Sequence, residues 1–354
     1  MTNKEMESLN FLITNAKAQT FPGTVYSLKQ EFKGKIISVS YKENAIGAFL
    51  SDKNFIISKN DSSQYIREIL SICKEEKIDV IIPLSIEERI IFLKNKQLFD
   101  ENEIKIFSSS IESIENAENK VFLYELCKKN NILTPYFYVV NNYTDLKEKA
   151  LLLGYPQKKV IIKPINSCGS RGLRILNKKA DYKKNFYNIR ADYTEITLSD
   201  LRNIIGSKFR DLMLCEYISG EEYTVDCLRL TEHHFSFPRI RKEVKNGLTY
   251  VGQMSKHEEI IQSSQKLANI LDLTTVFGFQ FRLNEMNKPV IIDCNPRIQG
   301  TMIMSTLAEA NVIAAGIKIL LNKTKVEFNP DWNMTYYRFW GGVSVGKTKK
   351  IVNF

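Results

Sequence analysis

The sequence predicts an α/β protein in which an N-terminal parallel sheet is followed by α+β lobes. In the first 107 residues, short apolar segments alternate with amphipathic helical segments, which is typical of a parallel sheet with helices on both faces. From residue 158 onward, strand-like segments follow one another across short turns, as in α+β lobes. The length of 354 residues exceeds the usual size of a single core, so we expect two or three subdomains.

The N-terminal region contains five segments with the apolar, β-branched character of short strands. After the first of them the chain reads NAKAQTFPG, which lacks the spacing GxGxxG, so dinucleotide binding has no support here. These segments predict a mononucleotide-type α/β domain. The predicted strands lie at 10–14, 35–40, 54–58, 79–83 and 104–107, and helical patterns occupy 63–75 and 86–95.

The remaining two thirds of the chain mix helices with strands. Helices are predicted over 116–131, 144–153, 181–205, 260–271 and 308–321. Strands are predicted over 158–176, where a loop of small residues interrupts them, and over 212–216, 223–230, 236–242, 249–251 and in FGFQFRLNE and VIID. The segment from residue 327 has no clear pattern.

Charge and cysteine content narrow the classes of protein. The formal net charge of +10 allows a polyanion partner, but lysines alternate with glutamates, as in KEEKID, and no nucleic-acid-binding motif accompanies them. No apolar run reaches the length of a membrane helix. The six cysteines include no CxxC pair, which disfavours a disulfide framework or a structural zinc site. We therefore expect a cytoplasmic protein without nucleic-acid or membrane partners.

The loop NSCGSRG (166–172) connects two strands. Its small residues let backbone N–H groups approach an anion, and Lys163 on the preceding strand supplies a cation. The loop does not match GxxxxGK[ST], so a Walker-type NTPase is excluded on spacing. Taken alone, the segment is equally well an ordinary glycine-containing hairpin.

The stretch LMLCEYISGEEYTVD (212–226) places Glu216 at the end of an apolar strand. We expect the backbone at Tyr217 and Ile218 to be free to pair with a purine rim, while Glu222 binds ribose hydroxyls. The alternative is a strand–turn–strand unit with surface acids.

The stretch VIIDCNPRIQGT (290–301) sets Asp293, Asn295 and Arg297 at spacing two behind an apolar strand, on one side of extended backbone. A strand pairing through the NEMNK turn would bring Gln280 opposite Asp293. Carboxylate and amide oxygens suit a hard cation such as Mg²⁺, and an adjacent arginine suits phosphate. A structural Arg–Asp pair at a strand end is the alternative.

Three further arginines are candidates for binding a substrate carboxylate. Arg239 and Arg241 in FPRIRKE lie on one face of a predicted strand, and Arg338 lies in YRFWGG. An exposed basic strand is an equal alternative for the first two. The histidines at 233, 234 and 257 are expected to be surface or loop residues.

Four stretches together resemble the ATP-grasp superfamily: NKVFLYELCKKNNILTP, VIIKPINSCGSRG, CEYISGEEYTVD and FGFQFRLN with VIIDCNPRIQG. Within it, the chain is most similar to the carbamoyl-phosphate-synthase-like, carboxylate–amine ligase branch. The resemblance implies an ATP-grasp fold behind an N-terminal pre-ATP-grasp domain at 1–115. The ATP-grasp domain would then span 116–325, with a small lobe at about 135–215 and a large lobe at about 216–325, before a tail at 326–354.

The resemblance also implies roles for individual residues. Asp293 replaces the more usual glutamate of the closing motif. Lys120 and Lys163 would bind phosphate, and the loop over the triphosphate would contain Ser167, Gly169, Ser170 and Gly172. The adenine and ribose would be bound by Glu216, Tyr217, Ile218 and Glu222. The metal ligands would be Gln280, Asp293 and Asn295, and the catalytic residues Arg297 and Lys163.

The implied activity is ligation of a small carboxylate to an amine, driven by ATP and Mg²⁺ (two ions, with Mn²⁺ as an alternative). The acid is activated as an acyl phosphate, and ADP and phosphate are released. Bicarbonate use, as in carbamoyl phosphate synthase or biotin carboxylase, and a non-catalytic nucleotide-binding protein are the alternatives. No AMKM-like biotin site is present. The apolar helix at 308–321 is compatible with a homodimer.

Overall fold

The chain folds into two compact units. The computed structural model describes residues 7–165, 172–183, 187, 194–245, 247–322, 325–339, 341–345 and 349–353. The first unit comprises residues 1–117, 223–280 and 294–354, and the second comprises residues 118–222 and 281–293. The boundaries predicted from the sequence, at 115 and 325, stay a prediction.

The N-terminal part of the first unit is a five-stranded sheet in the order β3-β2-β1-β4-β5, with every neighbouring pair parallel. Its strands are β1 (Phe11–Ile13), β2 (Ile36–Ser40), β3 (Lys53–Ile56), β4 (Val80–Ile82) and β5 (Lys105–Ile106). The helices are α2 (Phe21–Lys29), α3 (Gly47–Leu50), α4 (Tyr65–Glu75), α5 (Ile86–Lys94), α6 (Lys96–Asp100) and α7 (Ile111–Glu118).

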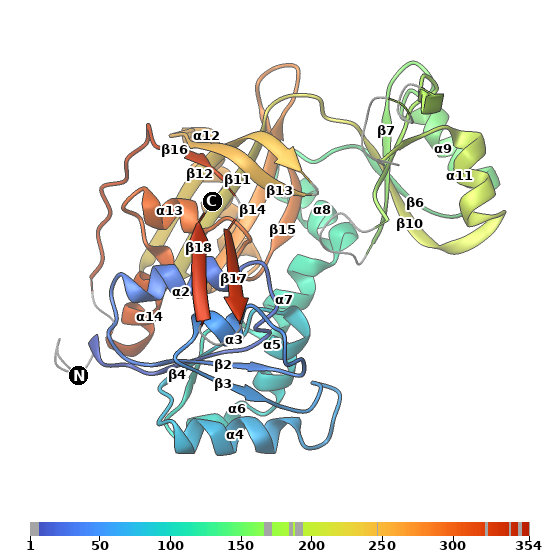
Figure 1. The fold of residues 1–354 in the computed structure, drawn as a ribbon. Helices are drawn as coiled ribbons and strands as arrows, with labels where there is room; N and C mark the ends of the chain where they lie inside the picture. Colours follow the sequence, from blue (N-terminus) through green and yellow to red (C-terminus); the bar gives the residue numbers. More distant parts are fainter. Residues whose placement is uncertain are drawn as a thin grey trace. The chain divides into compact units, whose positions relative to one another are not determined.

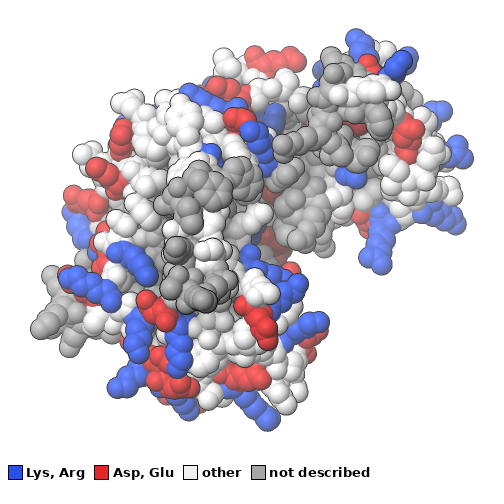
Figure 2. All heavy atoms as spheres, in the orientation of Figure 1, with Lys and Arg blue, Asp and Glu red and all other residues white. Residues whose placement is uncertain are grey.

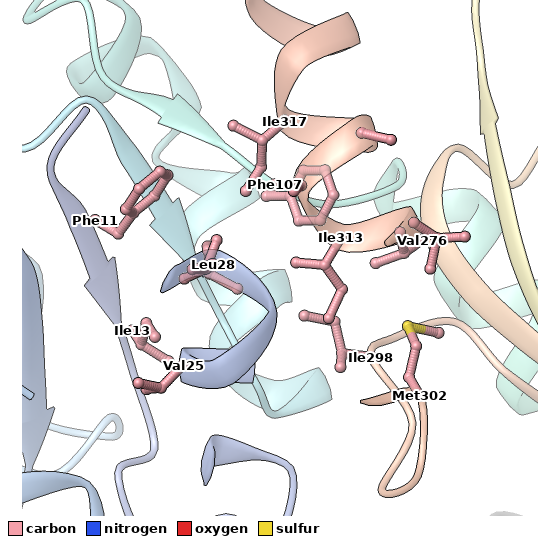
Figure 3. Close-up of a cluster of buried hydrophobic side chains, with 14 of the residues drawn as sticks. Phe11, Ile13, Val25, Leu28, Phe107, Val276, Ile298, Met302, Ile313 and Ile317 are labelled. Carbon is pink, nitrogen blue, oxygen red and sulfur yellow. The ribbon is translucent and has the colours of Figure 1, made fainter. Parts of the chain in front are cut away.

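The central strands β1, β2 and β4 are buried on both faces, which explains their mostly apolar sequences, whereas the edge strand β3 is partly exposed. Phe11 and Ile13 of β1 pack with α2 on one face, whereas Leu12 packs with α4 on the other. Figure 1 shows α2 and α4 on opposite faces, and Figure 3 shows Val25 and Leu28 of α2 beside Ile13 and Phe11. The predicted α/β class with an N-terminal parallel sheet is confirmed.

A second sheet has the order β15-β14-β11-β12-β13-β16; most of its residues belong to the first unit, and residues 281–293 of β14 and β15 belong to the second. The strand pairs β11–β12, β12–β13 and β13–β16 of this sheet are antiparallel. The strands are β11 (Glu222–Leu230), β12 (His233–Lys245), β13 (Leu248–Met254), β14 (Thr275–Leu283), β15 (Pro289–Asn295) and β16 (Thr335–Tyr337). With them lie α12 (Glu258–Ile270), α13 (Ile303–Leu307), α14 (Val312–Asn322) and the hairpin β17 (Gly341–Val345) and β18 (Lys349–Asn353).

The second unit contains a sheet in the order β6-β10-β7-β8-β9. Alternate apolar residues of β7 and β10 pack under α9 and α11, which lie beside these strands in Figure 1. The opposite face of the sheet is therefore available for other groups. The elements are α8 (Lys120–Lys129), β6 (Phe137–Asn142), α9 (Tyr143–Leu152), β7 (Val160–Pro164), β8 (Arg174–Leu176), β9 (Glu195–Ile196), α11 (Leu198–Ile205) and β10 (Lys208–Glu216).

Three sequence predictions need correction. The helix predicted over 181–205 is not continuous, because residues 195–196 form β9 and pair with β8; within the described residues, 182, 183, 187 and α11 are helical. The helix predicted over 116–131 is interrupted at Asn119, whose side chain caps α8 by accepting from the Phe122 N–H. Part of the unclassified tail forms β16, which extends the second sheet.

Within the described residues, no helix combines the length and apolar character needed to cross a membrane. On the face shown in Figure 2, lysine and arginine side chains are interspersed with acidic ones. Partly exposed ion pairs such as Lys105–Asp100, at 3.8 Å, also combine the two kinds of charge.

Candidate active site

Lys120 lies at the start of α8, directly behind the Asn119 cap. Lys120 is only 7% exposed, although its side chain carries a charge. Its Nζ lies 3.3 Å from Oδ1 of Asp293, near the end of β15. Two predicted site residues that are 173 positions apart in the sequence are thus in contact.

Lys163 lies on the face of β7 opposite to Ile162, which packs under the helices of the second unit. Its Nζ donates to the hydroxyl of Tyr124 and to the carbonyl of Ile292, both at 3.3 Å. The Tyr124 hydroxyl in turn donates to the same Ile292 carbonyl at 2.9 Å. Lys163 is therefore held at the same strand end as Lys120.

Cys215 of β10 is subject to the charges of both lysines. Burial raises the pKa of the Cys215 thiol to about 11, while the positive charges of Lys163 and Lys120 act to lower it. Two lysines and one carboxylate, that of Asp293, therefore lie around residues 292–293 of β15. Their excess positive charge suits a phosphate group.

The predicted purine-binding segment follows β10 directly. The Glu216 N–H donates to the Tyr136 carbonyl at 2.9 Å, and the Glu216 carboxylate accepts from the Tyr136 N–H at 3.3 Å. The carbonyl of Ile218 accepts from Arg282 Nη1 at 3.3 Å. The expectation that the backbone at Tyr217 and Ile218 is free is therefore wrong for the Ile218 carbonyl, because Arg282 binds it.

Arg282 of β14 also binds the predicted ribose acid. Its Nη2 lies 2.5 Å from Oε2 of Glu222, and its Nη1 lies 3.5 Å from the Gly220 carbonyl. One guanidinium therefore ties together the turn that carries Ile218 and Glu222. Tyr217 stands beside it, with the guanidinium carbon 6.0 Å from the centre of the Tyr217 ring.

Most of the predicted phosphate loop, including Ser167, Gly169 and Ser170, lies outside the described residues. Gly172 is described and has a φ of +72°, which non-glycine residues rarely adopt. A Cβ at this position would also lie 2.8 Å from Pro164 Cγ. Glycine is thus required where the chain leaves the loop.

The predicted metal ligands occupy β14 and β15. Asp293 and Asn295 are two residues apart in β15 and so lie on one face of the strand, and Gln280 lies in β14, the neighbouring strand. The Asn295 side-chain oxygen accepts from Arg297 Nη2 at 3.2 Å. These three side chains supply one carboxylate and two amide oxygens, a donor set that fits Mg²⁺. Among the described residues, no cluster of three or more histidine, cysteine or acidic side chains offers another site.

Arg239 is wholly buried and bound to Asp226, which is also wholly buried. Its Nε and Nη2 donate to the two Asp226 carboxylate oxygens at 2.9 and 3.1 Å, and Ser305 donates to Asp226 at 2.6 Å. Arg239 Nη2 also lies 3.5 Å from the Gln299 side-chain oxygen. These contacts favour a structural role, and substrate binding by Arg239 stays a prediction.

Gln299 anchors the 295–301 loop to the sheet. Its Nε2 donates to the Val225 carbonyl at 3.4 Å, and a Cβ on Gly278 would lie 1.3 Å from that nitrogen. The bare backbone of Gly278 thus provides the space for the Gln299 amide.

Arg241 and Arg338 contact β13 at the same residue. Arg241 Nε donates to the Thr249 hydroxyl at 3.0 Å, and Arg338 Nε donates to the Thr249 carbonyl at 3.2 Å. Arg338 Nη2 lies 3.5 Å from the Gly300 carbonyl, so this side chain borders the 295–301 loop. Both remain candidates for binding an acid.

Tyr124 and Arg282 are site residues that the sequence prediction missed. A signal existed for each, since Tyr124 lies four residues after Lys120 on the same helix face and Arg282 lies two after Gln280 on the same strand face. The surface assignment of the histidines is wrong for His233, which is in β12 and only 6% exposed.

Two family models match the chain. Residues 208–338 match a family described as ATP-grasp in the biosynthetic pathway with Ter operon. Residues 11–107 match the PylC-like N-terminal domain.

Relatives of known activity are also detectable. The chain is 25% identical over 277 residues to the carbamoyl phosphate synthase large chain of Clostridium acetobutylicum, covering 75% of this chain but only 24% of that protein. It is 28% identical over 197 residues to the D-alanine–D-alanine ligase of Petrotoga mobilis, covering 51% of this chain and 59% of the ligase.

Among solved structures, the biotin carboxylase–β-γ-ATP complex from Campylobacter jejuni has a similar fold. The TM-score is 0.66 at 17% identity, over 92% of this chain and 73% of the carboxylase. The resemblance read from the four sequence motifs is confirmed: the chain carries an ATP-grasp domain behind a PylC-like N-terminal domain.

Proposed function

We propose that the protein is an ATP-dependent ligase that activates a small carboxylate as an acyl phosphate and joins it to an amine. The observation that carries this proposal is the convergence of Lys120 and Lys163 with Asp293 at the end of β15. Similarity to carbamoyl phosphate synthase and to D-alanine–D-alanine ligase supports it. A cytoplasmic location and a homodimer belong to the same proposal.

In this proposal, the side chains of the second unit bind ATP. Glu216, Tyr217 and Ile218 contact the adenine, Glu222 binds the ribose, and the lysines 120 and 163 neutralise phosphate charge. The predicted loop residues Ser167, Gly169, Ser170 and Gly172 exclude water from the triphosphate. Phosphoryl transfer needs such positioning and charge neutralisation more than covalent help from the protein.

Mg²⁺ would be held by Gln280, Asp293 and Asn295. The full proposal includes two Mg²⁺ ions, with Mn²⁺ as an alternative metal. The metal would supply charge neutralisation on the phosphate oxygens. Arg297 stabilises the transferring phosphoryl group, with Arg241 and Arg338 as candidate contacts to the acid. A carboxylate oxygen attacks the γ-phosphorus and ADP departs; the amine then attacks the acyl carbon, the C–O bond to phosphate breaks, and phosphate leaves.

The test is ADP and phosphate release from purified protein offered small acids and amines, singly and in pairs. Release that requires ATP, one acid and one amine is the expected result. Formation of AMP and pyrophosphate overturns the proposal. ADP release that requires bicarbonate and no other acid assigns the chain to the bicarbonate-using alternative, and ATP binding without turnover assigns it to the non-catalytic one.

Asp293→Asn tests the site itself. We expect at least a 100-fold loss of turnover, because the amide removes the charged oxygen ligand while preserving shape. Asp211→Asn is the matched control, since Asp211 is an exposed acid of β10 in the same unit. An active Asp293→Asn enzyme would contradict the assigned role.

A further inference from the structure

The N-terminal parallel sheet has a topological switch point between β1 and β4. From β1 the chain order runs outward through β2 and β3 on one side, and through β4 and β5 on the other. In open parallel sheets, ligands bind outside the carboxyl ends of the strands at such a point. Here Thr14 follows β1, and its N–H donates to the Ile82 carbonyl of β4 at 3.3 Å.

Arg89 lies beside this point with its side chain wholly buried. Its Nε donates to the Pro83 carbonyl, just after β4, at 3.1 Å. Its Nη1 lies 3.5 Å from the hydroxyl of Ser108, just after β5. Within the described part of the chain, its Nη2 is buried and has no hydrogen-bond partner.

No described carboxylate forms an ion pair with Arg89. The adjacent Glu88 accepts from the hydroxyls of Thr14, Tyr65 and Ser85 at 2.8–2.9 Å instead. Burial raises the pKa of Glu88, which favours its neutral form. Among the described residues, Arg89 therefore has no counter-charge, and a buried cation of this kind costs several kcal/mol unless an anion completes it.

The positive charge of a second arginine, Arg297, also acts on Arg89. Burial, followed by the positive charge of Arg297, lowers the pKa of Arg89 to about 9. Ile298 is next to Arg297 and belongs to the same core cluster as Leu84 and Phe107, as Figure 3 shows for Ile298 and Phe107. Leu84 follows Pro83 and Phe107 precedes Ser108, the two residues that Arg89 contacts. Arg297 is half-buried, and its guanidinium donates to the side-chain oxygen of Asn295 and to the carbonyl of Ile298.

We propose that Arg89 and Arg297 together bind a carboxylate group of the acid substrate at the switch point of the N-terminal sheet. A carboxylate offers two oxygens to the Nη2 side of a guanidinium and supplies the missing negative charge. The N-terminal domain then contributes directly to acid recognition. This inference rests on the proposed ligase activity for the identity of the substrate, but anion binding itself does not.

The test measures thermal stabilisation of the full chain by sodium acetate against sodium chloride at equal ionic strength, without ATP. We expect a rise in Tm with acetate that Arg89→Met reduces at least tenfold in apparent affinity. Arg67→Met, which removes an exposed arginine of α4, serves as the matched control and should respond like the unmodified protein.

Arg89→Met should fold, because replacing an uncompensated buried charge by an apolar side chain is not expected to destabilise. If it does not fold, Arg89→Lys keeps the charge but loses the Nη2 donor, and it should show the same loss of acetate response. An unmodified protein without an acetate response, or an arginine 89 variant that responds normally, overturns the inference. A response to inorganic phosphate but not to acetate overturns the carboxylate assignment.

Turnover separates this inference from the proposed function. With an active acid–amine pair, Arg89→Met should raise KM for the acid at least tenfold and leave KM for ATP unchanged. Equal changes in both constants would indicate a merely structural role. An acetate response that depends on Arg89 in a protein without ligase activity would leave the anion site standing while the proposed function fails.

Discussion

Replacing Arg239 by methionine distinguishes a structural pair from a substrate contact. The guanidinium and the Asp226 carboxylate are both wholly buried and are joined by hydrogen bonds of 2.9 and 3.1 Å. Arg239→Met leaves Asp226 in the core with Ser305 as its hydroxyl partner. Breaking a buried pair by removing one member typically costs about 3–5 kcal/mol, because the remaining charge stays desolvated.

The expected loss of stability can be measured as a fall in Tm, and a second substitution at Asp226 tests its cause. A loss of about 3–5 kcal/mol corresponds to a fall of roughly 6–20 °C in Tm for a domain of about 150–250 residues. Arg239→Met combined with Asp226→Leu removes both charges and should recover at least about 2 kcal/mol of the loss. Arg241→Met, which removes hydrogen bonds from a half-buried arginine two residues away, should cost only about 1 kcal/mol.

The assay is urea unfolding followed by tryptophan fluorescence. Trp332 packs against Phe237, with ring centres 6.0 Å apart, so it reports on this part of the core. A loss below about 1 kcal/mol in the single variant, or no recovery in the double variant, would refute the reasoning. A stable single variant with a raised KM for the acid would instead assign Arg239 to the substrate.

Two further predictions concern pH and thiol reactivity. Burial, with the positive charge of Arg229, lowers the pKa of His234 to about 4. The unfolded state therefore binds this proton more readily than the folded state. The contribution of His234 to the free energy of unfolding is fully present above pH 6.5 and should be lost as the pH drops towards 4, so the Tm should fall less steeply in His234→Gln. Equal Tm profiles of the two proteins from pH 7 to 5 would contradict this. The five described cysteines are buried free thiols, so native Cys168→Ser protein should show no fast reaction with a thiol reagent at pH 8, but five reactive thiols after denaturation.

The parts of the fold that the sequence predicted are those with a strong local pattern. The central N-terminal strands β1, β2 and β4 are buried on both faces and have mostly apolar sequences, and α4 has a clear amphipathic period. The two residues of β9 are too few to show a period. Strand β16 exists because it pairs with β13, more than 80 positions earlier, which no local pattern reveals.

The site divides in the same way. Lys163 and Asp293 were predicted because they stand at strand ends inside recognisable motifs. The hydrogen bonds of Tyr124, Arg282 and Arg89 depend on partners elsewhere in the chain, so these residues read as ordinary core or surface positions. Arg239 was predicted as a substrate contact because no local pattern reveals its partner Asp226, which lies on the neighbouring strand, diagonally across the pair.

The contact between Gly278 and Gln299 makes two distant positions dependent on each other. Any side chain at 278 would displace the amide that holds the loop beside Arg297, so a change there is tolerable only with a shorter residue at 299. In related chains these two positions should therefore vary as a pair, and an unmatched exchange at either one would mark a protein whose loop has moved away from the sheet.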